Sequence, residues 1–395
     1  MKKLIQCLAT STASLGALAA FAAISSACTI ATTDVATDAG PNTLPDGALV
    51  QPTLPFVPSN IASLAAHDLS AVADATMSAD CTISTDPGTS GSYGCADAPA
   101  VEWVETMPGG SQVHVFAYNS FNLSQTATLK FSGSLPAILI AFHDLTLSGK
   151  VIAAPDATNV PGPGGFSVTP YFTKGGGPGG GPAGVQNGGG PAPGTGATAG
   201  ISGGGGSFCG LGGPGTDEGD TAGPLTISGA PATPAYGTSN LVPLVAGSSG
   251  GNGGLGAAGS GGGAVQLIAG GVFTLGNLAS IDVGGGSGSG SGETNAGQEA
   301  SGGGSGGAIL IEAMSATISG ALAANGGGGG AKSSNGELAS ADANPALGGT
   351  DNGAPQGGNG SAAATINGAA GLALADSSAG AGGGGAGRIR INTAN

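Results

Sequence analysis

Apolar runs separated by polar turns occur from residue 101 onward and predict short β-strands. Residues 101–104 alternate between apolar and polar side chains, as an edge strand does. Residues 113–118 form an apolar run that is followed by a second run at 121–124. The same two runs recur 24 residues later, at 137–142 and 145–148, which indicates a repeated structural unit.

Each unit continues into a third apolar run, and the whole unit recurs downstream. The third runs and the later copies are 128–131 and 151–154, then 264–269 with 273–276 and 280–283, then 308–313 with 316–320 and 322–324, and a truncated copy at 387–392. A unit of three strands and two turns is typical of one coil of a solenoid. We therefore predict an all-β chain built as a right-handed parallel β-helix, a β-solenoid, with a β-sandwich as the alternative.

Glycine-rich insertions separate the predicted coils, at about residues 161–263, 284–307 and 325–386. Glycine makes up 84 of the 395 residues, and 74 of these follow residue 161. The insertions are either flexible loops, as Gly/Ser linkers are, or extended left-handed polyglycine helices that hydrogen-bond to their neighbours. The sequence leaves both arrangements open.

Composition excludes several classes of protein. Collagen needs glycine at every third residue, whereas here glycines come in clusters such as 326–330. Only 8% of residues are charged, and the chain holds eight Lys and Arg for a net charge of −15. Nucleic-acid binding requires many cations that neutralise phosphates, so we expect no nucleic-acid partner.

The N-terminus has the pattern of an export signal. Lys2 and Lys3 precede an apolar run at 4–24, and small residues lead to Cys28. Residues 1–27 are therefore predicted to be a signal peptide, with one membrane-spanning helix as the alternative. Cys28 is a candidate lipidation site, since the residues before it resemble a lipobox, although the usual leucine is replaced by serine.

The segments after the signal peptide differ in composition. A Thr/Pro-rich stretch at 28–60 predicts an extended tether. Residues 61–160 are predicted to hold an N-terminal cap, with a short helix between 61 and 77, and the first β-helix coils. Residues 161–395 are predicted to be the glycine-rich part of the β-solenoid with its inserted glycine loops.

Two cysteines are predicted to form a disulfide. Cys81 and Cys95 bracket a turn, and export places them in an oxidising compartment. A zinc site is a weak alternative because two thiolates without a nearby histidine do not complete a zinc shell. Cys209 is either free or paired with an unlipidated Cys28.

Candidate catalytic, cofactor and metal residues are sparse. None of the glycine-rich strings has the Lys-Ser/Thr partner of a phosphate loop, and one calcium-like pattern at 212–217 lacks the following apolar residue. A triad at His114 or His143 would need an acid and a nucleophile beside it, and lyase chemistry at Lys130 or Lys150 would need acids that hold a cation. We expect no catalytic, cofactor or metal site. Five aromatic residues could stack on sugars, namely Trp103, Phe116, Tyr118, Tyr171 and Phe172.

The glycine-bearing units carry a family resemblance. Residues 302–313, 323–328, 240–251 and 383–389 resemble those of glycine-rich secreted or lipoprotein-like proteins that are abundant in myxobacteria and their relatives. The likeness covers residues 78–395. It implies a β-solenoid and a surface location, and it implies no activity. A looser likeness is to β-helical adhesins.

These features together lead us to expect a non-enzymatic exported protein of the outer membrane, cell surface or extracellular space. It would be structural or adhesive, displaying glycine-rich loops to extracellular polysaccharide or a neighbouring cell, with a lipid at Cys28 as its membrane link. The alternative is a polysaccharide-binding or polysaccharide-degrading protein, a lyase or hydrolase, on the same scaffold.

Overall fold

The computed structural model describes residues 51–88, 95, 99, 101–107, 110–167, 176–178, 201–216, 234–253, 256–291, 299–374 and 378–394. The predicted signal peptide, Cys28 and the tether up to residue 50 lie outside the described residues. All statements below concern the described part of the chain.

The described chain is all-β, with one 3-10 helix of three residues and no α-helix. The elements are η1 (Leu64–Ala66), β1 (Ala75–Met77), β2 (Cys81–Ser84), β3 (Val101–Thr106), β4 (Gln112–Tyr118), β5 (Phe121–Leu123), β6 (Thr128–Ser132), β7 (Ala137–Ala141), β8 (Leu145–Leu147), β9 (Lys150–Ile152), β10 (Ala264–Leu275), β11 (Ser280–Asp282), β12 (Ala308–Ile318), β13 (Ala321–Ala323), β14 (Thr350–Asp351), β15 (Ala354–Pro355), β16 (Ala373–Leu374), β17 (Ser378–Ala379) and β18 (Arg388–Thr393). In place of the short helix expected between residues 61 and 77, the chain forms η1 and β1.

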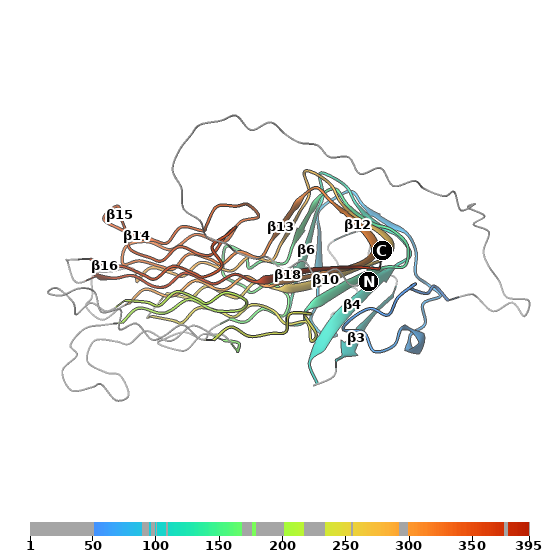
Figure 1. Ribbon diagram of the computed structural model, residues 1–395, viewed down its shortest axis with the longest axis horizontal. Coiled ribbons are helices and arrows are strands. Elements are labelled where there is room, and N and C mark those ends of the chain that lie inside the picture. The colour runs from blue at the N-terminus through green and yellow to red at the C-terminus, as the bar shows by residue number, and fades with distance from the viewer. Residues whose placement is uncertain are drawn as a thin grey trace, which may run out of the picture. The chain divides into compact units, whose positions relative to one another are not determined.

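Two sheets enclose the main hydrophobic core (Figure 1). A curved nine-stranded sheet runs from β3 through β4, β7, β10 and β12 to β18. Strand β8 lies beside the second half of β10, and β5 and β1 follow it in that order. A five-stranded sheet has the order β13-β11-β9-β6-β2. Aligned side chains from successive strands fill the space between the sheets. One such column contains Phe116, Leu139, Leu267, Ile311 and Ile391.

The predicted right-handed parallel β-helix is wrong. The nine-stranded sheet mixes orientations, since β3 pairs antiparallel with β4 while the other strands are parallel, and it curves as half a barrel. After β9 the chain also no longer passes from layer to layer through short turns: 111 residues separate Ile152 at the end of β9 from Ala264 at the start of β10. The glycine segments that intervene have their own ordered packing, which a closed column of coils does not provide.

The glycine segments are extended, and their backbone groups hydrogen-bond to neighbouring segments of the same chain. Residues 301–307 donate to three neighbours in turn. The donations go from Ser301, Gly304 and Gly307 to Ser289, Gly286 and Val283, from Gly302 and Ser305 to Gly251 and Ser248, and from Gly303 and Gly306 to Gly382 and Gly385. A return to the same neighbour at every third residue is the period of the polyproline II helix, which has no internal hydrogen bonds.

The same segment accepts hydrogen bonds from three further neighbours. Its carbonyl groups receive the N–H groups of Gly203 and Gly206, of Gly259 and Gly262, and of Gly327 and Gly330. One glycine segment therefore has six hydrogen-bonded neighbours, and we call this array the glycine lattice. Of the two arrangements that the sequence left open, the ordered one is present, because these hydrogen bonds satisfy backbone groups that would otherwise be buried unpaired.

Close approach explains why glycine is required in the lattice. A Cβ atom on Gly302 would lie 2.0 Å from the carbonyl oxygen of Gly204, and one on Gly304 would lie 2.0 Å from that of Ser260. Atoms at this distance overlap, so any side chain at these positions forces the neighbouring segments apart. By contrast, a Cβ on Gly276, in the turn after β10, would meet Leu147 O at 3.5 Å, an ordinary contact.

We predict that Gly304→Ala destabilises the fold while Gly276→Ala does not. The first variant forces backbone apart in a closely packed array and should cost about 3 kcal/mol. The second should stay within about 1 kcal/mol of the parent. Thermal and denaturant unfolding of both variants measure the difference. Equal stability of the two would contradict the lattice packing.

The predicted disulfide is present. Cys81, in β2, is bonded to Cys95, 14 residues later. Strand β2 is an edge strand of the five-stranded sheet, and the disulfide therefore links Cys95 to the main hydrophobic core. Cys209, within the glycine-rich part, is a free thiol.

Candidate functional site

A segment at residues 51–72, which we call the strap, lies on the outer face of the nine-stranded sheet. This face is apolar as well, because β4, β7, β10 and β12 alternate two sets of apolar side chains. Ile61 and Leu69 of the strap join the outer cluster with Val115, Ile138 and Leu310. The strap therefore covers a face that would otherwise be exposed to water. Its residues 51–60 belong to the stretch that we expected to be tether.

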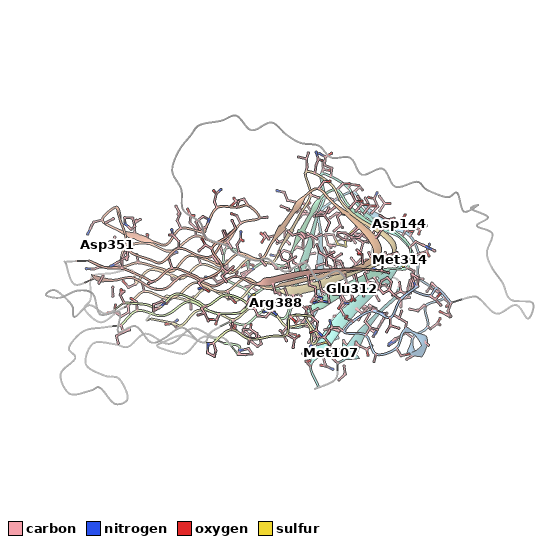
Figure 2. The ribbon with its side chains drawn as sticks, in the orientation of Figure 1. Met107, Asp144, Glu312, Met314, Asp351 and Arg388 are labelled. Atoms are coloured by element: carbon pink, nitrogen blue, oxygen red, sulfur yellow. A yellow bond between two sulfur atoms is a disulfide. The ribbon has the colours of Figure 1, made fainter. Side chains whose placement is uncertain are left out.

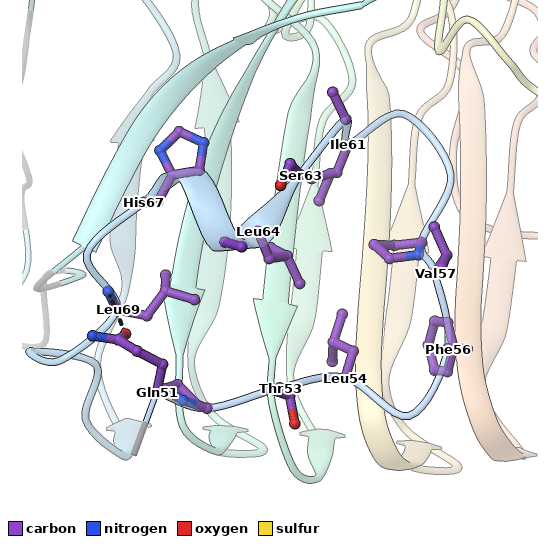
Figure 3. Close-up of a pocket in the computed structure, with 14 residues that line it drawn as sticks. Gln51, Thr53, Leu54, Phe56, Val57, Ile61, Ser63, Leu64, His67 and Leu69 are labelled. Atoms are coloured by element: carbon purple, nitrogen blue, oxygen red, sulfur yellow. Dashed lines mark hydrogen bonds between the residues drawn. The ribbon is translucent and has the colours of Figure 1, made fainter. Parts of the chain in front are cut away.

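The strap closes on itself around a pocket of about 440 Å³ (Figure 3). Gln51 Oε1 accepts a hydrogen bond from the Leu69 backbone N at 2.9 Å, which joins the two ends of the loop. The lining is mainly apolar, with Leu54, Phe56 and Leu64 among its side chains. The pocket thus offers mainly apolar surface, and His67, whose Nε2 lies 3.5 Å from Glu105 Oε2, is the titratable side chain in its lining.

A buried carboxylate fastens the strap to the sheet. Glu312 lies on the outer face of β12 (Figure 2), 6% exposed. It accepts hydrogen bonds from Ser59 N and Ser59 Oγ, both at 2.8 Å, from Gln266 Nε2 at 2.7 Å and from Asn392 Nδ2 at 3.2 Å. Four donors around one carboxylate compensate for its removal from water.

The network continues into a second covering segment. Asn60 Nδ2 donates to Gln266 Oε1 at 3.1 Å and to the Leu241 carbonyl at 3.0 Å. Its Oδ1 accepts from Leu244 N at 3.0 Å. The strap, the loop around residues 236–246 and β10 are therefore held by one buried polar network whose central members are Asn60, Gln266 and Glu312.

We predict that Glu312→Gln loosens the strap. An amide places an NH₂ group against donors, so the variant loses hydrogen bonds to a charged acceptor and should cost about 2–3 kcal/mol. Ser59→Ala removes only the hydroxyl bond and should cost about 1 kcal/mol. Unfolding and limited proteolysis within residues 51–69 measure both effects. The assignment fails if Glu312→Gln is as stable and as protease-resistant as the parent.

Two histidines pair with carboxylates on opposite faces of the β3–β4 hairpin. On the outer face, His67 of the strap stacks on Trp103 at 4.1 Å between ring centroids, and its Nε2 lies 3.5 Å from Glu105 Oε2. On the inner face, His114 Nε2 lies 3.4 Å from Glu102 Oε2. Trp103 Nε1 also donates to Glu105 at 3.0 Å. The outer pair ties the hairpin to the strap, and the inner pair joins β3 to β4.

The other residues singled out in the sequence are not brought together. Lys130 Nζ lies 3.8 Å from Asp156 Oδ2, and hydrogen bonds from Thr158, with a contribution from Lys130, lower the pKa of Asp156. Phe116 and Tyr118 are buried and unable to stack on a sugar. Tyr171, Phe172 and the acids at 217–220 lie outside the described residues. Where the chain is described, no group of three His, Cys, Asp or Glu side chains could hold a metal ion.

The pKa of Asp282 is strongly raised. This residue lies at the end of β11, and burial raises its pKa to about 6, with a smaller contribution from the carboxylate of Asp342. A hydrogen bond from Gly284 N at 2.9 Å acts in the opposite direction. Because the folded-state pKa lies above the unfolded value, the neutral form favours folding. This stability is present at low pH and is lost as pH rises from about 4 through about 6.

We predict that Asp282→Asn stabilises the protein above pH 7 and leaves its stability unchanged near pH 4. The amide oxygen keeps the bond from Gly284, and the buried charge is removed. A shift of this size corresponds to about 2–3 kcal/mol at neutral pH. Unfolding curves of parent and variant from pH 4 to pH 8 measure the difference. A pH-independent difference between them would contradict the titration.

The polar network was missed from the sequence, although a signal was present. Gln266 and Glu312 interrupt otherwise apolar runs, at the third position of 264–269 and at the fifth position of 308–313. A polar residue at a core position implies a buried partner. The partner itself, Ser59, is 253 residues from Glu312 and could not be inferred.

Comparisons with known proteins do not suggest a family: no family model, no curated protein and no solved structure matches this chain. Within the described ranges, no helix has the length and apolarity needed to cross a membrane.

Proposed function

We propose that the chain is a non-enzymatic exported protein of the cell surface or extracellular matrix, and that it acts by holding loops on a rigid body. The glycine lattice is the observation that carries this proposal. Export, a lipid at Cys28 and the outer-membrane or extracellular location belong to the proposal and derive from the sequence alone.

The lattice supports a role in display because its stability does not depend on side chains. Segment 301–307 is fixed by backbone hydrogen bonds to six neighbours, so the turns that join such segments are free to vary in sequence. The hairpins β14–β15 and β16–β17 lie at the end of the glycine-rich body that is away from the two large sheets (Figure 1). Loops at such turns are well placed to contact a partner.

The described side chains also favour contact over chemistry. Two acids that could have served as a general acid or base, Glu312 and Asp282, are engaged in structure. Glu312 accepts four hydrogen bonds within the network that anchors the strap. Asp282 accepts a bond from its own turn. The partner that we propose is extracellular polysaccharide or the surface of a neighbouring cell.

We predict that the purified chain is retained on one or more extracellular polysaccharides without altering them. A panel of soluble and immobilised polysaccharides, with and without calcium, is assayed for retention and for new reducing or unsaturated sugar ends. Retention without products is the expected result. The double variant Lys130→Ala with Lys150→Ala should be retained equally, because neither lysine takes part in display.

Product formation would overturn the proposal and establish the polysaccharide-degrading alternative, above all if the double lysine variant lost it. Absence of both retention and products would remove the adhesive role and leave a structural one. Surface labelling of cells that express the chain would then test whether it is displayed at all.

A further inference from the structure

The two edges of the nine-stranded sheet differ in how they end. In the core column, Phe116, Leu139, Leu267 and Ile311 are at most 1% exposed, whereas Ile391 of β18 is 44% exposed and its neighbour Ile389 is 40% exposed. At the same end of the core, Ile318 of β12 and Leu322 of β13 are only partly buried. Their partners on the preceding strands, Leu275 and Ile281, are fully buried. The β18 end of the core is therefore uncovered in the described structure.

The backbone edge of β18 is also available. Among the described strands, it pairs with β12 alone. Its outer-face side chains include Arg388 and Arg390, two of the eight basic residues in an acidic chain. Arg390 donates to Asn392 Oδ1 at 2.8 Å and to the Ser239 carbonyl at 3.1 Å. No carboxylate of the described chain lies within 4.0 Å of either arginine.

The opposite edge of the same sheet is acidic. Strand β3 pairs only with β4 among the described elements. It carries Glu102 and Glu105, whose acidic side chains are 15% and 11% exposed and whose ion-pair partners are histidines. Both β3 and β18 are six residues long. One copy of the chain therefore presents a basic edge with exposed isoleucines, and an edge of equal length that carries two largely buried acids beside histidines.

We propose that copies of this chain associate head to tail, with β18 of one copy adding antiparallel to β3 of the next. Because β4, β7, β10, β12 and β18 are parallel and β3 is antiparallel to β4, stacking copies in one orientation brings β18 and β3 together as an antiparallel pair. The nine-stranded sheets then continue from copy to copy, and repeated addition gives a filament because the contact does not close.

One register matches charge on the outer face. With the outer faces continuous, Arg388 lies opposite Glu105 of the next copy and Arg390 lies opposite Trp103 of the next copy. These are an ion pair and a cation–π contact. On the inner face, Ile389 lies opposite Val104 of the next copy and Ile391 lies opposite Glu102 of the next copy. Pairing β18 with a second β18 instead brings four arginines to one seam, which like-charge repulsion disfavours.

The test measures assembly size by analytical ultracentrifugation of the purified chain over a range of concentrations. We expect the parent to form assemblies that lengthen with concentration and shorten at high salt. The variant Arg388→Glu with Arg390→Glu should sediment as a monomer. A control with the same charge change, Lys150→Glu with Lys332→Glu, should assemble like the parent. Ile391→Glu should also abolish assembly, and circular dichroism verifies that each variant is folded.

A mixing experiment separates head-to-tail assembly from a closed dimer. The arginine variant retains its β3 edge, so it should add to the β18 end of a parent filament and stop growth, which lowers the average size in proportion to the amount added. A parent dimer unaffected by mixing would overturn the proposal and indicate β18–β18 pairing. A monomeric parent at every concentration would also overturn it, whereas the display function would still stand.

Discussion

The fold depends on one constraint: a polyglycine chain can satisfy its backbone groups only through neighbouring chains. A three-residue-per-turn helix has no internal hydrogen bonds, and glycine loses more conformational freedom on folding than any other residue. A single glycine segment is therefore unstable, while an array in which segment 301–307 has six partners is stable. The low content of charged and aromatic residues follows from the same constraint, because the lattice leaves little room for side chains.

The strands of the sheets set the direction and register of the glycine segments that are continuous with them. The segments that lead into β10, β12 and β18 are parallel, with Gly259 and Gly262 donating to Gly302 and Ser305, and Gly303 and Gly306 donating to Gly382 and Gly385. The segments that leave β11 and β13 run antiparallel to these. The parallel strands therefore align the glycine segments, and the lattice in turn holds strands that are far apart in sequence in their pairing register. Neither part determines the fold alone.

Local pattern predicted strands β3 to β13 and β18 because each contains apolar runs of the right length, and the third strands β6, β9, β11 and β13 lie where the repeat places them. It missed β1, where a helix was expected, and also β2 and β14 to β17. It also predicted the Cys81–Cys95 disulfide. It predicted the wrong architecture because a glycine segment has no side-chain pattern from which its neighbours could be read. The antiparallel pairing of β3 and the position of the strap depend on contacts across long stretches of chain, such as that of Ser59 with Glu312, and local pattern does not encode these.

The strap follows from the strands themselves. Strands that are apolar on both faces need cover on both faces. The five-stranded sheet covers the inner face, and the outer face is left to segments without regular structure. Such segments bury backbone groups that a strand would have paired, so they require side-chain partners. Gln266 and Glu312 supply these partners from within the apolar strands, where each replaces a hydrophobic residue. The two polar residues that look misplaced in the sequence are therefore those that allow an irregular segment to close the second core.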